Sequence, residues 1–189
     1  MPAIYRLYKQ MNKEKEHLIE GCRRKERRAQ LKLYEQYSRS LYLSCLRIIG
    51  EAKEAEEAEE AMQDSFLKIL THLDQYREEQ NFEAWMKRIA IHTAIDYVRK
   101  ENPELVEISD QLPDEPCEES DEEETNYTVE QIKRAVKELP VGYRTILSLY
   151  LFEGYDMEEI ASILKIKPAS VRSQYLRAKQ KLLNIIASY

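Results

Sequence analysis

Six basic side chains and no acidic one lie between Lys165 and Lys181. Apolar residues recur through this segment at helical spacing and would form one buried face: Val171, Tyr175, Ala178 and Leu182. The opposite face carries residue types that read duplex DNA, because Arg bonds guanine, Gln bonds adenine, and Ser and Lys suit phosphate. The candidate contacts are Lys167, Ser170, Arg172, Ser173, Gln174, Arg177 and Lys181. We predict that this helix lies in the major groove.

A helix that enters the groove needs a second helix to support it, and the preceding residues predict one. Asp156 is a strong N-cap, and Glu159 completes a capping box. Ile160, Ala161 and Leu164 would form its buried face, and Pro168 suits the first turn of the next helix. Lys165 stands in the turn where glycine is frequent, which predicts some backbone strain. The pattern is that of a helix-turn-helix.

Two further helical patterns precede this motif. One carries Ile132, Val136 and Leu139 and is stopped by Pro140; the other carries Ile146, Leu149 and Tyr150 and is stopped near Gly154. Together they predict a four-helix domain over residues 127–189.

The first half of the chain also shows helical apolar spacing, in three segments. The first segment has Leu31, Tyr34, Leu41, Cys45 and Ile48 roughly on one face and ends near Gly50. The second has Met62, Phe66, Ile69 and Leu70 on one face, and Trp85, Ile89, His92 and Asp96 begin the third. We predict a helical bundle over residues 20–100, preceded by an N-terminal extension over residues 1–19. The fold class is therefore all-α, with two small helical domains.

A flexible acidic linker is expected between these domains, over residues 101–126. This stretch holds twelve acidic residues and no basic one, so the net charge of −6 becomes +6 for the rest of the chain. Its prolines and lack of aromatic residues leave too little apolar surface to offset ordering entropy. One interpretation is a soluble tether that sets the spacing of the two domains.

Composition argues against several other classes of protein. No apolar run is long enough to span a membrane, and the first residues lack a signal-peptide core, which favours the cytoplasm. The three cysteines, Cys22, Cys45 and Cys117, predict neither a disulfide framework nor a zinc site. No nucleophile–base pair, phosphate-binding glycine loop or metal-loop spacing occurs. We expect no catalytic residue, no metal, no cofactor and no enzymatic activity.

Three segments, in this order, resemble bacterial RNA polymerase sigma factors of the extracytoplasmic-function group. They are AEEAMQDSFLKIL (58–70), FEAWMKRIAIHTAIDYVRK (82–100) and the stretch from VKELPVGYR through the helix-turn-helix. That group keeps sigma regions 2 and 4, which the resemblance places at residues 20–100 and 127–189. The chain departs from the group's frequent residues at Glu78, where glycine is common, and at His92, where asparagine is common.

The resemblance implies that the protein binds a promoter at two elements, which we call the two-point grip. Region 4 would recognise the duplex −35 element, and region 2 would melt and read the −10 element. Aromatic side chains stack on unpaired bases and cations follow the backbone. The implied −10 contacts are Tyr76, Arg77, Asn81, Phe82, Lys87, Arg88, His92, Arg99 and Lys100. Trp85 is expected to pack in the core.

The resemblance also implies partners. Core RNA polymerase, through its β and β′ subunits, would be bound by Gln63, Asp64, Phe66, Leu67 and Leu70, although Phe66 also fits the core. Promoter DNA and an anti-sigma factor are the other expected partners, without membrane insertion. The resemblance also suggests a second interpretation of residues 101–126, as a nucleic-acid mimic that lies in a basic channel of the polymerase, and this stays open beside the tether. Two alternatives remain open: a two-domain helix-turn-helix regulator that is not a polymerase subunit, and a helical protein-interaction adaptor.

Overall fold

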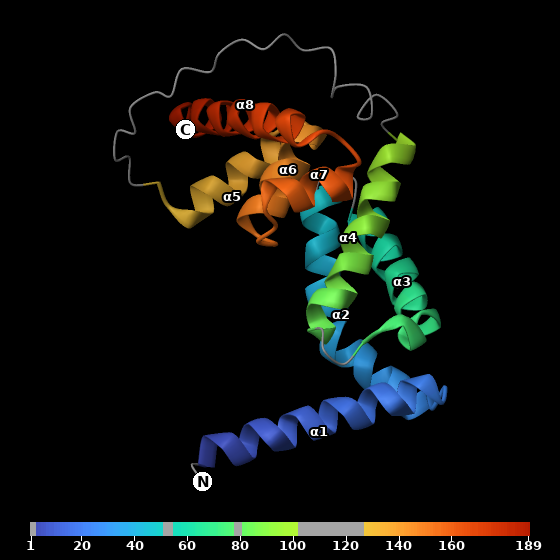
Figure 1. The fold of residues 1–189 in the computed structure, drawn as a ribbon. Coiled ribbons are helices and arrows are strands. Elements are labelled where there is room, and N and C mark those ends of the chain that lie inside the picture. Colours follow the sequence, from blue (N-terminus) through green and yellow to red (C-terminus); the bar gives the residue numbers. More distant parts are fainter. Residues whose placement is uncertain (1–2, 51–54, 78–80, 102–126) are drawn as a thin grey trace.

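The computed structural model describes residues 3–50, 55–77, 81–101 and 127–189. Within these residues every regular element is a helix, which confirms the all-α prediction (Figure 1). The elements are α1 (Ala3–Arg23), α2 (Arg27–Ile49), α3 (Ala55–Thr71), the 3-10 turn η1 (Leu73–Gln75), α4 (Phe82–Glu101), α5 (Val129–Glu138), α6 (Val141–Leu151), α7 (Met157–Leu164) and α8 (Pro168–Ala187). The predicted acidic linker lies outside the described residues, apart from Glu101 at the end of α4.

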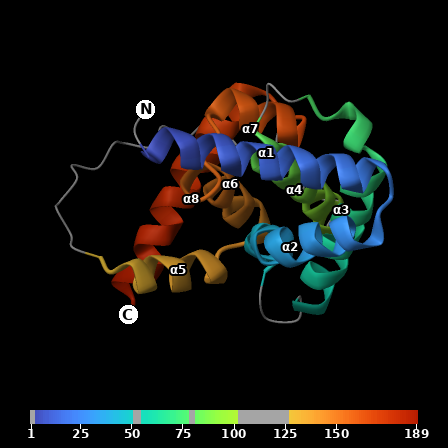
Figure 2. The same cartoon turned by 90° about the horizontal axis from the view of Figure 1, so that it is seen from below.

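Helices α1–α4 form the N-terminal bundle, in which α2, α3 and α4 pack against one another. Its core is contiguous and includes Leu33, Ile48, Ile69 and Met86. Helix α1 joins through Leu18, Ile19 and Cys22 near its end, while its beginning projects away from the bundle (Figure 1). The view from below shows α1 crossing beneath the other helices (Figure 2). Part of the predicted extension over residues 1–19 is thus a helix anchored at one end.

The apolar face predicted for α2 is partly wrong, and α4 buries residues beside those that the sequence analysis singled out. Leu31 is 57% exposed, whereas Leu33 is fully buried, because α2 turns that side toward α3 and α4. On α4 the buried line runs through Met86, Ala90 and Ala94. Trp85, Ile89 and His92 lie beside that line and are only half-buried. The face predicted for α3 is confirmed, with Met62, Phe66 and Ile69 buried.

Helices α5–α8 form the C-terminal domain, and its predicted helix ends are largely confirmed. Helix α5 ends before Pro140, and α6 ends at Leu151, ahead of Gly154, whose φ of 76° favours glycine. Asp156 and Glu159 form the expected capping box of α7. Lys165 is left-handed, with φ 55°, and Pro168 begins α8. Both features agree with the sequence prediction.

The two bodies lie against each other, because α6 packs on the C-terminal half of α2. Buried residues of the helix-turn-helix, such as Ile160 and Val171, belong to the same apolar cluster as the N-terminal bundle. A second cluster, around Ala135, Leu147 and Ala178, belongs to the C-terminal domain alone. Among the described helices none is long and apolar enough to cross a lipid bilayer.

Candidate nucleic-acid interface

Helix α8 buries one face in the C-terminal domain and leaves the other accessible. Val171, Ala178 and Leu182 are buried, as the sequence predicts. Six of the seven predicted duplex contacts are exposed or half-buried: Lys167, Ser170, Arg172, Ser173, Arg177 and Lys181. These side chains form the accessible basic face of the helix, which we call the α8 face.

Gln174 does not belong to the α8 face, so this prediction needs correction. Its side chain is 8% exposed. Position 174 follows Val171 by three residues and precedes Ala178 by four, so all three lie on one side of the helix. Helical spacing therefore already places Gln174 on the buried side, and only its polar residue type had suggested a place on the DNA-reading face.

Arg172 contacts the supporting helix of the motif. Its Nη2 lies 2.9 Å from Glu158 Oε1, and both side chains are more than half exposed. An exposed ion pair of this kind contributes little stability, because water and salt screen it. The guanidinium can therefore exchange this partner for an acceptor on DNA.

The first turn of α8 presents its N-terminus at the motif's tight turn. Lys167 is the N-cap and Pro168 supplies no N–H there. The acid-free helix start combines the positive end of the helix dipole with a lysine. Such an end favours a phosphate group, which would fix the helix on the duplex.

A second candidate site is a pocket of about 320 Å³ between α3, η1 and α4. Its lining combines one indole, several cationic or imidazole side chains and two polar groups: Lys68, His72, Gln75, Trp85, Arg88, Ile89, His92 and Thr93. An aromatic wall beside cations is suited to one unpaired base and its phosphate. We call this the α3–α4 pocket.

The two histidines of the α3–α4 pocket are fixed in the same way. Nδ1 of His92 lies 2.7 Å from the carbonyl oxygen of Arg88, and Nδ1 of His72 lies 2.7 Å from that of Lys68. A carbonyl only accepts, so each Nδ1 carries the hydrogen. In the neutral form of such a ring, Nε2 is the acceptor.

The predicted −10 contacts separate into two groups. Tyr76 and Phe82 are buried and pack edge-on with centroids 4.8 Å apart, so neither ring offers an accessible stacking face. Phe82 also stacks on Trp85, whose half-buried ring reaches the pocket. The accessible group is Arg77, Asn81, Lys87, Arg88, His92, Arg99 and Lys100, all exposed or half-buried. The buried aromatics position Trp85 and the start of α4.

Several accessible residues of α4 already have partners. Asn81 Oδ1 accepts from the N–H of Ala84 at the helix start. Lys87 pairs with Glu83, and Lys100 lies over the ring of Tyr97. Arg99 Nη2 donates to the carbonyl oxygen of Leu164, 2.8 Å away on α7. Arg99 is therefore engaged with the C-terminal domain in this arrangement.

The candidate polymerase contacts lie on α3. Gln63, Asp64 and Leu67 are exposed, with Leu67 at 63%, whereas Phe66 is buried against Tyr34 and Leu70 is half-buried. Asp64 accepts a hydrogen bond from Tyr97, and burial together with this bond raises the pKa of Tyr97 to about 12. The exposed part of the predicted set thus forms one patch, and Phe66 supports it from below.

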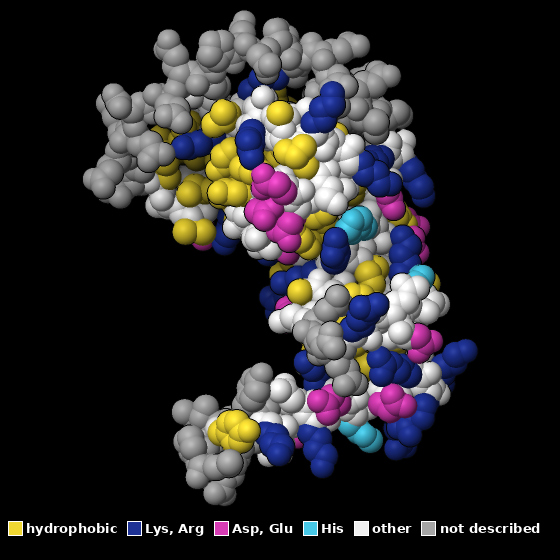
Figure 3. All heavy atoms as spheres, viewed as in Figure 1, with side chains coloured by type: hydrophobic (Ala, Val, Ile, Leu, Met, Phe, Trp, Pro, Cys, Tyr) yellow, Lys and Arg dark blue, Asp and Glu magenta, His cyan; other side chains and the backbone are white. Residues whose placement is uncertain are grey.

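Sequence reasoning missed two features of these surfaces. Lys68, His72 and Gln75 were not assigned to any site, because only the packing of α3 against α4 brings them beside Arg88 and His92. In the C-terminal domain, Tyr150, Leu151, Phe152 and Leu176 are large and exposed. Figure 3 shows hydrophobic side chains gathered over this domain and basic ones spread over the N-terminal bundle.

Comparison with known proteins agrees with this division. A profile described as Sigma-70 region 2 matches residues 33–104, and one described as Sigma-70, region 4 matches residues 129–182. The RNA polymerase sigma-H factor of Pseudomonas aeruginosa is 29% identical, over 88% of this chain and 91% of the relative. SigV of Bacillus subtilis, also an RNA polymerase sigma factor, is 32% identical over 70% of this chain and 77% of its own length.

Solved structures show the same fold. The sigma factor RpoE of Bartonella quintana, crystallised with the anti-sigma factor NepR, matches with a TM-score of 0.54 at 20% identity. The match covers 82% of this chain and 95% of that one. With both sigma profiles in order and relatives aligned along most of their length, the chain belongs to the sigma-70 family of RNA polymerase sigma factors, in its extracytoplasmic-function group.

Proposed function

We propose that this sigma factor binds core RNA polymerase and directs initiation by gripping promoter DNA at two points. The observation that carries the proposal is the accessible α8 face on a complete helix-turn-helix, paired with a region 2 bundle that holds a cationic, aromatic-lined pocket. Bond formation belongs to the polymerase, so this chain contributes position and strand separation.

The α8 face reads the −35 element in this proposal. Arg172 and Arg177 bond base edges, while Lys167, Ser170, Ser173 and Lys181 contact phosphates or nearby bases. Their support comes from exposure and from the capped helix α7 beneath them. Gln174 is left out, because it is buried.

The α3–α4 pocket holds one unpaired base of the −10 element. Trp85 supplies the stacking surface, and Lys68, Arg88 and His92 surround the base or its phosphate. Arg77, Asn81, Lys87, Arg99 and Lys100 line the approach along the loop and α4. Separating a base from its stack has a cost, and a preformed pocket offsets it.

Polymerase binds the exposed patch of Gln63, Asp64 and Leu67 on α3. The patch is on α3 and the α8 face is on α8, so different residues serve polymerase and the −35 duplex. An anti-sigma factor is a further expected partner, since the structural relative RpoE was solved in complex with one. Acting with polymerase places the chain in the cytoplasm.

Transcription in vitro with core polymerase and a promoter library tests the proposal. Core polymerase alone is the control, and initiation at a defined set of sequences only when the chain is present is the expected result. If the chain instead binds DNA but gives no specific initiation, the regulator alternative replaces it. If the protein keeps its function after the charges of both Arg172 and Arg177 are reversed, the adaptor alternative replaces the sigma-factor proposal.

A further inference from the structure

We propose that the surface formed by the end of α2 and the end of α4 is a docking site for the chain's own C-terminal domain. In this closed state the two promoter-reading sites cannot engage together. The inference extends the proposed function, because it concerns how the two sites become available. Its structural part rests on contacts alone and does not depend on DNA binding.

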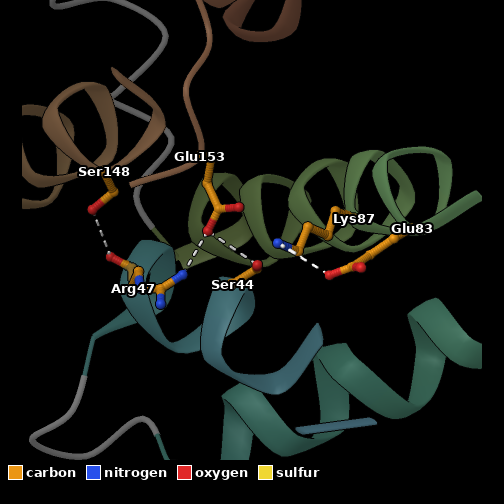
Figure 4. A network of polar contacts seen from close by, with 6 residues as sticks. All are labelled: Ser44, Arg47, Glu83, Lys87, Ser148 and Glu153. Carbon is orange, nitrogen blue, oxygen red and sulfur yellow. Dashed lines mark hydrogen bonds and ion pairs between the residues drawn. The ribbon is translucent and has the colours of Figure 1, made fainter. Parts of the chain in front are cut away.

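The contact centres on a buried ion pair between the two bodies. Glu153, in the turn after α6, has a side chain only 3% exposed. Its Oε1 accepts from Arg47 Nη1 at 2.7 Å and from Ser44 Oγ at 3.0 Å, both on α2 (Figure 4). A carboxylate this deeply buried requires such donors, because an uncompensated charge would be costly. The Arg47 guanidinium also lies over the ring of Phe152.

Each body also caps a helix end of the other. The last carbonyls of a helix lack partners within that helix. From α6, Ser148 Oγ donates to the carbonyl of Arg47, and Arg144 donates to that of Ile49, so the last turn of α2 is capped (Figure 4 shows the first bond). In return Arg99 of α4 caps α7 at Leu164. We call these contacts and the Glu153 pair the α2–α6 latch.

In the closed arrangement, the two DNA-reading sites lie too close together to reach both promoter elements at once. The names of the elements place them about 25 base pairs apart, or about 85 Å along duplex DNA at 3.4 Å per pair. Arg99 touches α7 just before the turn into α8, and α4 with its 20 residues is only about 30 Å long. Both ends of the grip thus lie within roughly one helix length of each other.

Opening the α2–α6 latch removes this conflict. Residues 102–126 connect the bodies and, fully extended, reach at most about 85 Å. The chain is therefore long enough to span both elements once the bodies separate. Release also frees Arg99 for the DNA contact proposed above.

Charge reversal across the pair tests the latch in the full-length chain. Glu153→Arg and Arg47→Glu each place like charges together, whereas the double variant restores an opposite pair with its members exchanged. Small-angle scattering should show a compact wild type, a larger radius of gyration for each single variant, and a return toward wild type for the double variant. The matched control is Glu83→Lys, which alters the exposed Glu83–Lys87 pair within α4 and touches no C-terminal residue (Figure 4).

A DNA measurement adds the functional consequence. Partly opened promoter DNA with both elements should bind the single variants more tightly, on the order of tenfold if about one molecule in ten is open in the wild type. A duplex with the −35 element alone should bind all variants equally. Circular dichroism checks that helical content is unchanged, and the double variant guards against misfolding of either single one.

Two results would overturn the proposal: an extended wild type in solution, or single variants whose scattering matches wild type while remaining folded. If the wild type is compact and the single variants are extended, but none of them binds DNA, the α2–α6 latch is supported and the proposed function is contradicted.

Discussion

At the scale of single residues, the DNA-reading surfaces depend on which side chains are accessible and which partners they can exchange. Arg172 is exposed and held only by a screened ion pair, whereas Arg99 is held by a backbone carbonyl of the other body. His92 is fixed by a short bond through Nδ1. These differences predict distinct effects for substitutions that composition alone would treat alike.

Arg172→Ala should weaken binding of the chain to a −35 duplex by about 1–3 kcal/mol and relax base preference at one position. The reason is loss of a bidentate contact that no neighbour can replace. Fluorescence anisotropy against a set of single-base variants measures both effects. Arg134→Ala is the matched control, because Arg134 is an exposed arginine on α5, paired with Glu138 and outside the α8 face. Equal losses for the two variants would remove Arg172 from the base-reading set.

His92→Asn should change which base the α3–α4 pocket prefers. With Nδ1 donating to Arg88, neutral His92 offers only an acceptor, which favours bases that present an amino group. Asparagine offers both a donor and an acceptor, so discrimination among bases should fall, by about 1 kcal/mol for one hydrogen bond. Initiation from promoters that differ at one −10 base measures this. His17→Asn, on the exposed side of α1, should change nothing; an unaltered preference in His92→Asn would contradict the assignment.

At the scale of elements, local signals decide where each helix begins and ends. The capping boxes at Thr128 and Asp156 both start helices of the C-terminal domain. The turn at Lys165 joins α7 to α8 in a left-handed backbone conformation, which glycine adopts freely and residues with a side chain adopt with strain. The motif therefore keeps a lysine at some cost in stability.

Lys165→Gly should stabilise the chain by up to about 1 kcal/mol, because glycine adopts a positive φ without steric penalty. Thermal unfolding followed by circular dichroism would show a higher midpoint. Lys181→Gly is the matched control: Lys181 is an exposed position inside α8, where glycine relieves no positive φ and should lower the midpoint. A lower midpoint for Lys165→Gly would mean that the lysine side chain stabilises the fold by more than the strained backbone at this position destabilises it.

At the scale of the whole molecule, contact between the two bodies is incompatible with binding both promoter elements, which requires the bodies to separate. The α2–α6 latch holds the bodies together, and the segment between them must span the promoter when the latch opens. Residues 101–126 carry twelve acidic side chains and no basic one. The tether and nucleic-acid-mimic interpretations of this segment predict different outcomes when it is altered.

Shortening residues 102–126 to eight residues limits the reach to about 28 Å. We expect initiation that depends on the −35 element to be lost, while binding of the −35 duplex alone stays intact. Run-off transcription on promoters with and without a −35 element separates the two effects. A full-length version with its acids replaced by serine is the control: full activity favours the tether, and reduced initiation with normal promoter binding favours the mimic. Full activity of the shortened chain would contradict the two-point grip.

Apart from α1, most of which was predicted only as an N-terminal extension, the sequence by itself determined the described α-helices, several of their ends and the basic, DNA-type face on α8. These features follow from short-range rules: Pro140 and Gly154 stop helices, Asp156 caps one, and a run of bases without acids needs solvent or phosphate. The family resemblance added the order of the two regions. It also supplied the −10 set, of which Arg88 and His92 do line one pocket.

Only the tertiary structure decided what depends on a neighbouring element. Leu33 rather than Leu31 is buried, because the facing helices choose among side chains that periodicity places equally well. Lys68 and His72 reach the pocket only because α3 lies beside α4. Glu153, an ordinary acid after a helix in the sequence, becomes a buried partner of Arg47 on a helix more than one hundred residues earlier. Local spacing carries no information on such pairs, since the approach of two folded bodies creates them.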